Sequence, residues 1–238
     1  MTRITLISDT HAKHNQLNGD LPGGDILIHA GDFMTDGYNH LEARQFFHWF
    51  NAINTYETKI FISGNHDRIM QNEPENMGGI LTGYKTIDYL QDETCVLYGD
   101  GPNGDFPEDN IRIYGSPWQP WFHNWAFNLP RNGEELKQKW SNIPENTHIL
   151  ITHGPAWGYN DTTEWDRDAH LGCELLRERI DVIRPKIHVT GHIHSGHGYY
   201  FDGHTHHFNA SVLNERYNYS NKPFTFDWDH ITNEIVWI

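Results

Sequence analysis

The chain has 238 residues, of which 37% are hydrophobic and 13% aromatic, so one α/β domain with a sizeable core is within its reach. Its formal net charge of -15 argues against binding along a nucleic-acid backbone, which requires clustered lysine and arginine. No apolar run approaches the roughly 18 residues of a membrane span, and segment 1–8 is too short in its apolar part for a signal peptide. The two cysteines, Cys95 and Cys173, lie far apart in apolar contexts, which favours free buried thiols. We therefore expect a cytoplasmic protein that does not enter a membrane.

Short runs rich in isoleucine, leucine and valine predict strands that end on small residues and glycine. These strands cover 3–8, 25–30, 59–63, 147–152 and 186–190. Between them, Asn39 is placed to cap a helix with apolar residues at three- and four-residue spacing from Leu41 to Ile53. A second apolar stripe predicts a helix over 172–183, which Pro185 ends. Strands that alternate with helices indicate a parallel sheet.

The middle and the end of the chain have a different pattern. Short strands joined by turns are predicted over 86–90, 94–98, 111–114, 199–201, 205–211, 223–227 and 234–238. Together, the two patterns predict an α/β fold, a four-layer α/β/β/α sandwich of two mixed sheets flanked by helices. No repeat or linker divides residues 1–238, so we expect a single domain.

Five polar motifs each follow a predicted strand. They are Asp9-Thr10-His11, Gly31-Asp32, Gly64-Asn65-His66-Asp67, Thr152-His153-Gly154 and Gly191-His192-Ile193-His194. Because α/β folds place their sites at the carboxyl ends of strands, we expect these side chains to meet. Two aspartates, one asparagine and four histidines suffice for two metal ions that share a carboxylate, with one histidine to spare. This constellation is typical of a phosphoesterase with paired metals.

The position of each side chain indicates its role. His192 and His194 are two residues apart, so they project together and could serve one ion each, as Asp9 and His11 could serve a single ion. Asp32 has two oxygens with which to bridge two ions, and the Asn65 amide oxygen is a neutral ligand. His66 is expected to point toward substrate, and Asp67 to hold its ring in one tautomer and favour its charged form. Singly, each motif also has an ordinary structural interpretation as a loop, cap or turn.

Residues 116–131 form an unusual aromatic insert. It contains Trp118, Trp121 and Trp125 together with three prolines. The insert could be a hydrophobic cap on the sheet, or a wall that stacks on a base or another flat substrate group. Both interpretations stay open at this point.

The five motifs resemble those of the calcineurin-like metallophosphoesterase superfamily. Further stretches are similar to the metallophosphoesterase-domain proteins known from vertebrate brain and their microbial relatives, often grouped with class III cyclic nucleotide phosphodiesterases. These stretches are Ile7-Ser8-Asp9-Thr10-His11, His29-Ala30-Gly31-Asp32-Phe33, Tyr114-Gly115-Ser116-Pro117-Trp118, Phe127-Asn128-Leu129-Pro130-Arg131, Arg184-Pro185-Lys186 and Phe208-Asn209-Ala210-Ser211. Some vertebrate members carry glycine where this chain has His192, so the ligand set here is complete.

The resemblance implies a ligand set for each of two ions. Asp9, His11, Asp32 and His194 would hold the first ion, and Asp32, Asn65, His153 and His192 the second. His66 would meet the phosphate and the leaving oxygen, while a hydroxide that bridges the metals attacks phosphorus in line. Imidazole and carboxylate ligands favour two divalent transition-metal ions, manganese first, with iron, nickel, cobalt or zinc as alternatives.

The expected partner is a small phosphorylated substrate. Small phosphodiesters, including 2′,3′- or 3′,5′-cyclic nucleotides, are the leading hypothesis, with Asn65, His66, Trp118, Trp121 and Trp125 as candidate substrate contacts. The alternatives are a phosphomonoesterase, a phosphoprotein phosphatase, or a nucleotide-binding scaffold of low activity. A zinc-storage role for the 18 histidines is a further, weaker alternative.

Overall fold

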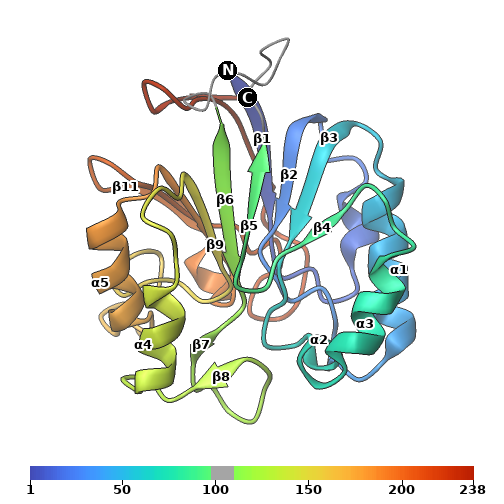
Figure 1. Ribbon diagram of the computed structural model, residues 1–238, viewed down its shortest axis with the longest axis horizontal. Coiled ribbons are helices and arrows are strands. Elements are labelled where there is room, and N and C mark those ends of the chain that lie inside the picture. The colour runs from blue at the N-terminus through green and yellow to red at the C-terminus, as the bar shows by residue number, and fades with distance from the viewer. Residues whose placement is uncertain (98–109) are drawn as a thin grey trace.

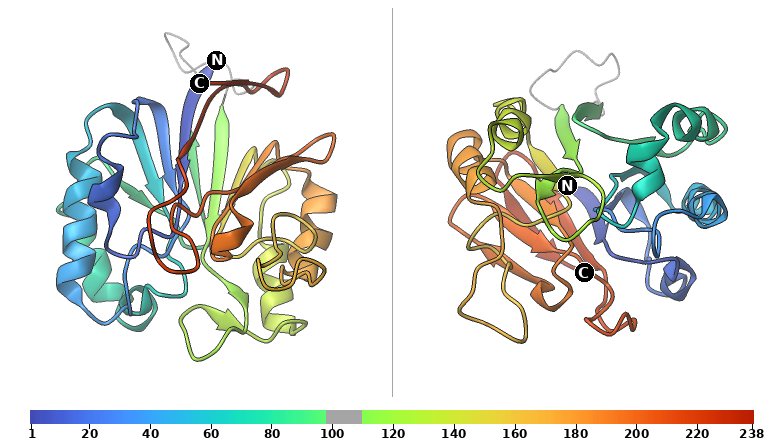
Figure 2. Two further views of the ribbon diagram at one scale, coloured as in Figure 1. Left: turned by 180° about the vertical axis from the view of Figure 1, so that it is seen from behind. Right: turned by 90° about the horizontal axis from the view of Figure 1, so that it is seen from below.

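The computed structural model describes residues 1–97 and 110–238 (Figure 1). Two mixed sheets stack face to face, and helices cover the outer face of each, as the views from behind and below also show (Figure 2). The predicted four-layer α/β/β/α sandwich is therefore confirmed. None of the helices in the described part of the chain is long and apolar enough to cross a membrane.

The first sheet joins both ends of the described chain. Its order is β14 (Glu234–Trp237), β13 (Phe224–Asp229), β1 (Thr2–Ile7), β2 (Gly24–His29), β3 (Tyr56–Phe61) and β4 (Asp88–Tyr89). Strands β1 to β4 are parallel, whereas β13 and β14 pair antiparallel. The carboxyl ends of β1, β2 and β3 therefore meet at one edge.

The second sheet is built in the same way. Its order is β11 (Gly198–Phe201), β12 (His206–Asn209), β10 (Ile187–Thr190), β9 (Ile149–Thr152), β6 (Ile111–Ser116) and β5 (Glu93–Leu97). Strands β12, β10, β9 and β6 are parallel, and an antiparallel strand closes each side. The predicted strand over 94–98 thus begins one residue earlier, and its last residue, Tyr98, lies outside the described residues.

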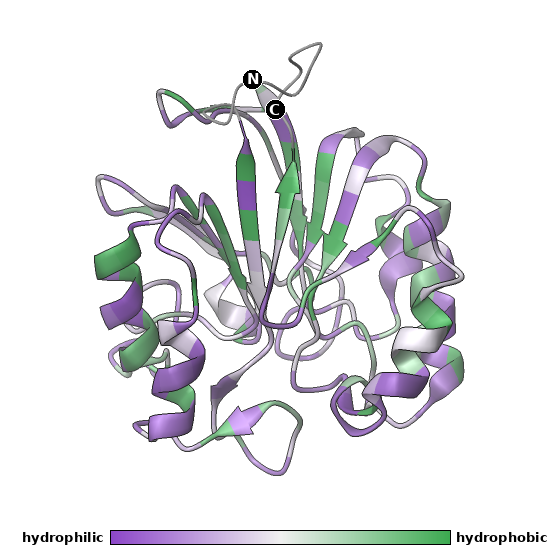
Figure 3. Ribbon diagram, in the orientation of Figure 1, coloured by the Kyte–Doolittle hydropathy of each residue, from purple (hydrophilic) through white to green (hydrophobic). Residues whose placement is uncertain are grey.

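Three apolar layers hold the sandwich together. Within β1, Ile4 and Leu6 face the second sheet, whereas Ile7 faces the helices. The central strands β1, β2, β9 and β10 are buried on both faces over most of their length, which explains their continuous apolar runs. Figure 3 shows this as hydrophobic strands at the centre of the molecule.

Helices α1 (His40–Ala52), α2 (Arg68–Asn72) and α3 (Pro74–Leu81) cover the first sheet. Asn39 caps α1 as predicted, because its Oδ1 accepts a hydrogen bond from the Leu41 amide at 2.9 Å. Leu41 itself is 60% exposed, so the apolar stripe begins one turn later than we expected.

Helices α4 (Glu134–Ser141) and α5 (Glu174–Ile183) cover the second sheet. Helix α5 begins two residues after the predicted start, because Cys173 is its N-cap. It ends at Ile183 as predicted, with Arg184 as its C-cap before Pro185. Both cysteines are free, and only Cys173 is fully buried. The sequence patterns did not predict α2, α3 or α4, which are short and carry few apolar residues.

Candidate metal centre

All five motifs lie at the carboxyl ends of parallel strands. The loops after β1, β2 and β3 carry Asp9, His11, Asp32 and Asn65, and the loops after β9 and β10 carry His153, His192 and His194. His192 is half-buried and the other six are buried. Both sheets therefore contribute to one centre, at the lower edge of the sandwich in Figure 1.

The backbone at several of these residues is left-handed. Asp9, Asp32 and His192 have φ values of 54°, 58° and 67°, in a region that aspartate and histidine enter more readily than most residues. No residue with a side chain could replace Gly191, since a Cβ there would overlap the Asp9 carboxylate and Ser8. The loops are thus bent so that the polar side chains converge, and such strain is typical of functional sites.

One cluster of close contacts surrounds the Asp9 carboxylate. His194 Nε2 lies 3.3 Å from Asp9 Oδ1 and 3.3 Å from His11 Nε2. His11 Nε2 in turn lies 3.7 Å from Asp32 Oδ2. These contacts join the four residues that the resemblance assigns to a first ion.

A second cluster lies on the other side of Asp32. His153 Nε2 lies 3.3 Å from Asp32 Oδ2 and 3.0 Å from Asn65 Oδ1. His192 Nδ1 lies 2.7 Å from the same Asn65 oxygen. Asp32 is therefore the residue that the two clusters share.

The outer ring nitrogens show that these clusters suit cations. Nδ1 of His11 bonds the Met34 carbonyl at 3.0 Å, and Nδ1 of His194 bonds the Asn214 carbonyl at 3.0 Å. A carbonyl only accepts, so each Nδ1 carries the hydrogen and each neutral ring turns a lone pair inward. Facing lone pairs and carboxylates repel one another unless a cation lies between them. His153, whose Nδ1 bonds the Ala30 carbonyl at 2.9 Å, fits the same arrangement.

Protonation is the alternative way to relieve this repulsion. Burial lowers the pKa of His153, but the Asp32 carboxylate outweighs burial and raises the pKa to about 9. Asp9 does the same for His194, whose pKa also rises to about 9 against the effect of burial. Protons and metal ions therefore compete for the same nitrogens.

Buried hydrogen bonds fix the loops behind the ligands. His29 on β2 contacts Thr10 Oγ1 at 2.9 Å, and His188 on β10 contacts Thr152 Oγ1 at 2.9 Å. Each threonine is adjacent to a predicted ligand. The two sheets thus use the same device, a buried histidine that holds the start of a ligand loop.

Asp67 occupies a different place from the one predicted. Its carboxylate accepts backbone N–H groups from Asp32, Met34 and Gly64 at 2.7–2.9 Å. The His66 ring bonds the Thr35 carbonyl through Nδ1 instead. The predicted contact of Asp67 with the His66 ring is therefore wrong. The turn after β3 directs the two side chains apart, and Asp67 joins two ligand loops.

His66 lies at the edge of the centre. Its amide donates to Asp32 Oδ1 at 2.7 Å, and its ring lies edge-on to His11 with centroids 4.6 Å apart. The Trp125 indole stacks on it at 3.9 Å, and the Arg68 guanidinium lies 4.5 Å from that indole. Of the three tryptophans predicted to contact substrate, Trp125 thus packs on a site residue.

The other two tryptophans of the insert lie apart from it. The Trp118 indole donates to Asp92 Oδ2 at 2.9 Å, and the Lys139 ammonium lies over its ring. Trp118 thus packs between the apolar cluster under α1 to α3 and the cluster under α4 and α5, away from the ligands. Trp118 is therefore not brought to the centre. Trp121 is 63% exposed and borders a cavity beside His192. Part of the insert forms a small parallel ladder of β7 (Gln119–Pro120) and β8 (Asn128–Leu129).

The structure adds residues that the motifs did not indicate. Tyr217 packs on His11 and His194, with ring centroids 4.8 and 5.2 Å apart. Tyr217 and Glu215 both line a small cavity whose walls include the candidate ligands Asp32 and His194. Neither follows a strand-end motif, so no sequence signal marked them. Ser211 donates to Asp9 Oδ2 at 2.7 Å and belongs to a stretch already noted for its resemblance.

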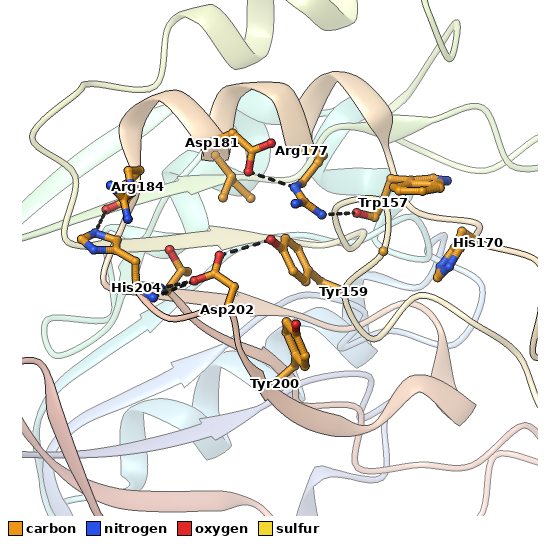
Figure 4. A pocket seen from close by; sticks show the side chains of 12 residues that line it. Trp157, Tyr159, His170, Arg177, Asp181, Arg184, Tyr200, Asp202 and His204 are labelled. Atoms are coloured by element: carbon orange, nitrogen blue, oxygen red, sulfur yellow. Dashed lines mark hydrogen bonds and ion pairs between the residues drawn. The ribbon is translucent and has the colours of Figure 1, made fainter.

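A larger cavity of about 510 Å³ lies elsewhere, between α5 and the turn that joins β11 to β12 (Figure 4). Its polar groups are largely paired with one another. Arg177 bonds Asp181 at 2.9 Å, and the Tyr159 hydroxyl donates to Asp202 at 3.2 Å. None of the predicted ligands lines it, so the candidate chemistry stays at the metal centre.

Comparison with known proteins identifies the family. The family model for calcineurin-like phosphoesterases matches residues 2–196. The chain belongs to the calcineurin-like phosphoesterase family. Membership implies hydrolysis of phosphoesters with a dinuclear metal centre, and the two clusters that share Asp32 fit such a centre.

Individual relatives match over nearly the whole chain. Metallophosphoesterase domain-containing protein 1 of Homo sapiens is 38% identical over 247 residues, covering 95% of this chain and 71% of the relative. A UPF0046 protein of Caenorhabditis elegans is 34% identical over 252 residues, covering 94% of this chain and 59% of the relative. In fold, the chain is similar to TT1561 of Thermus thermophilus, with a TM-score of 0.63 at 12% identity over 99% of this chain and 97% of that one.

Proposed function

We propose that this protein is a phosphodiesterase with two metal ions that acts on small phosphodiesters. The observation that carries the proposal is the charge of the small cavity that the candidate ligands line. This cavity, of about 100 Å³, is lined by no lysine or arginine among the described residues, and it contains the carboxylate of Glu215. The lining also includes Asp32, His66, His192 and Tyr217.

The charge of the substrate decides between the two ester classes. A phosphomonoester carries nearly two negative charges at pH 7, because its second pKa is about 6. Sites for such dianions usually add arginine or lysine to hold the extra charge. A phosphodiester carries one charge, which two bound cations can neutralise without help. A carboxylate at Glu215 therefore disfavours a monoester more than a diester.

The two clusters supply the ligands for the ions. In the proposed assignment, Asp9, His11, Asp32 and His194 hold the first ion, and Asp32, Asn65, His153 and His192 hold the second. Manganese is the proposed metal, with iron, nickel, cobalt or zinc as alternatives. The bound ions would supply the activated nucleophile and neutralise the phosphate.

His66 is proposed to act on the leaving group. Its Nδ1 is occupied by the Thr35 carbonyl, so Nε2 is the nitrogen left to face substrate. With a proton on Nε2, the ring can donate to the leaving oxygen as the ester bond breaks. Stacking on Trp125 and the backbone bond to Asp32 hold the ring in place. Asp67 contributes by fixing the loops of Asp32 and Gly64.

The test is a metal screen of the metal-free protein. Substrates are bis-p-nitrophenyl phosphate, p-nitrophenyl phosphate, and 2′,3′- and 3′,5′-cyclic nucleotides. We expect diester hydrolysis with manganese to exceed monoester hydrolysis. Preferential monoester turnover would favour a phosphomonoesterase, and no turnover with any metal would favour a nucleotide-binding scaffold.

A second comparison tests the role of Glu215. The Glu215 Oε1 accepts from the Ser195 amide and hydroxyl at 3.1 and 2.7 Å, and glutamine retains that acceptor. We expect Glu215→Gln to raise monoester turnover relative to diester turnover. Glu234→Gln, on the distant strand β14, is the matched control and should leave the ratio unchanged.

A further inference from the structure

A second cavity adjoins the metal centre. It measures about 230 Å³ and shares Phe122, His192 and Glu215 with the cavity that holds the candidate ligands. The two cavities therefore lie next to each other at His192. We call the second one the side cavity. Its walls are mainly apolar, and they include Pro120, Trp121, Phe122, Pro155, Leu171 and Ile193.

We propose that the side cavity binds one ester group of the substrate, and that this group is flat, uncharged and aromatic with a hydrogen-bond donor. The inference rests on the proposed phosphodiesterase function, because only a diester places a second organic group beside the phosphate. The chemical class is thus a phosphodiester of an aromatic or heteroaromatic alcohol. Shape, charge and hydrogen bonding each support one part of this description.

The size and the walls indicate a flat ring. A cavity of about 150 Å³ holds benzene in another protein, so about 230 Å³ admits a ring or two fused rings. Trp121 and Phe122 are 63% and 44% exposed, although large aromatic side chains are usually covered. The Phe122 ring lies edge-on to the candidate ligand His192, with ring centroids 5.1 Å apart. An aromatic group in the side cavity would cover the exposed rings of Trp121 and Phe122.

The charged residues at the side cavity are already paired. Arg131 donates through Nη1 to the Gly172 carbonyl and to Glu174 Oε2, both at 2.7 Å, and through Nη2 to the Leu171 carbonyl at 2.7 Å. Its guanidinium is thereby committed to the fold. Since Glu215 is acidic, the described residues that line the side cavity leave no lysine or arginine free for a second phosphate or a carboxylate. The bound group is therefore uncharged.

One buried acceptor lacks a partner. Gln119 is 1% exposed and lines the side cavity, and its Oε1 has no hydrogen bond within the described residues. Neighbouring bonds determine its orientation. Asn128 uses Nδ2 to donate to three carbonyls of the insert, so its Oδ1 must accept from Gln119 Nε2, at 3.3 Å.

This arrangement leaves Gln119 Oε1 as the free end of the amide. A buried acceptor without a partner costs free energy, which a donor on the bound group would recover. Gly154 stands next to it, where a Cβ would come within 3.7 Å of Oε1. Gly154 also lines the side cavity, so Oε1 lies close to the wall of that cavity.

Direct binding to the metal-loaded protein tests the proposal without any need for turnover. The probes are dimethyl phosphate, methyl phenyl phosphate and methyl 3-hydroxyphenyl phosphate, titrated by NMR. We expect the phenyl ester to bind more tightly than the dimethyl ester, by roughly 5- to 150-fold as for stacking on aromatic side chains. The hydroxyl group should tighten binding further.

Three variants separate the contributions. Trp121→Ala and Phe122→Ala should each reduce the preference for phenyl over methyl, whereas Gln119→Met should remove only the benefit of the hydroxyl. Trp165→Ala is the matched control, because Trp165 is 76% exposed and does not line the side cavity. An unchanged phenyl preference in both aromatic variants, or a hydroxyl benefit that survives in Gln119→Met, would overturn the proposal.

These experiments distinguish failure of the side-cavity proposal from failure of the proposed phosphodiesterase function. Aromatic binding with no diester turnover under any metal would refute the phosphodiesterase and leave the side cavity as a binding site. Diester turnover with equal affinity for methyl and phenyl esters would support the enzyme and refute the side cavity.

Discussion

The indole of Trp125 lies flat against the imidazole of His66, with centroids 3.9 Å apart and an angle of 24° between the planes. The face that could stack on a substrate base is thus in contact with a residue of the site. Arg68 lies over the same indole. Trp125 therefore positions His66, and it is poorly placed to select the substrate.

Trp125→Ala should consequently impair chemistry more than binding. With the stacking lost, the His66 ring gains freedom, and we expect kcat to fall roughly 10-fold with KM nearly unchanged, a fraction of the 10²–10⁴ of a full acid–base contribution. Trp125→Phe should restore most of kcat because it retains a stacking ring. A large rise in KM with kcat intact would instead assign Trp125 to substrate binding.

His66→Ala should retain both metal ions and lose roughly 10²–10⁴ in turnover, the usual size of an acid–base contribution. The loss should be smaller for a p-nitrophenyl leaving group than for an alkoxide, since p-nitrophenolate leaves without a proton. Steady-state kinetics on paired substrates, with metal analysis, measure this. Equal losses for both leaving groups would argue against proton donation.

Asp32→Asn should be the most damaging conservative change at the centre. Asn retains the acceptor for the His66 amide, so the fold should survive, but it removes the charge that the two clusters share. We expect low metal content and the loss of most activity, with an unchanged circular dichroism spectrum. Near wild-type hydrolysis would show that Asp32 does not bridge the ions.

His192→Gly should weaken one ion selectively. His192 contacts Asn65 in the second cluster, whereas Asp9, His11 and His194 of the first cluster are untouched. We expect one tightly held ion, low turnover and stronger inhibition by a nucleotide monophosphate, which gains room beside the phosphate. Metal analysis and inhibition constants measure this, and two full-occupancy ions with normal turnover would contradict it.

The exposed His123 offers the matched control for that variant. It lies in the aromatic insert, and His123→Gly should leave the metal content unchanged.

Acid should destabilise the fold through buried neutral histidines. Burial lowers the pKa of His29 to about 3 and that of His188 well below its ordinary value. In the unfolded chain both titrate near 6.5, so below that pH the unfolded state binds more protons. The free energy of unfolding should therefore decrease as pH falls, by up to about 1.4 kcal/mol per pH unit for each histidine.

Urea unfolding of the chelated protein between pH 6 and 5 measures that slope, above the range where most carboxylates titrate. His153 and His194, with pKa values of about 9, add little to the slope there because they are largely protonated in both states. His29→Gln should flatten the slope, and His123→Gln should not. An identical slope in all three proteins would show that His29 is not held neutral.

The ligands could be predicted from the sequence because each lies within four residues of the end of a strand. Parallel strands bring their carboxyl ends to one edge, so Asp9 and His153 meet although 144 positions separate them by number. Tyr217 could not be predicted in this way. Its loop reaches the centre through tertiary contacts, among them the bridge between Ser8 and Ser211.

Neighbours in sequence were misleading where the backbone turns sharply. Asp67 follows His66 directly, yet the two side chains bond different partners, because the carboxylate is drawn to free backbone N–H groups. Within the insert, the pairing of β7 with β8 separates Trp118 from Trp125. The sequence contains these aromatic residues but no signal for the direction in which each one faces.

Because both sheets contribute ligands to the centre, ions bound there would cross-link the two sheets. Asp9, Asp32 and Asn65 follow strands of the first sheet, and His153 and His194 follow strands of the second. Ions held by both sets would tie the sheets at their carboxyl edge, as a disulfide ties two segments, while the apolar layer sets the spacing between them. Substitutions in that layer would then change the separation of the ions without touching a ligand. The apolar core between the sheets would thus set the distance between the two ions, in addition to stabilising the fold.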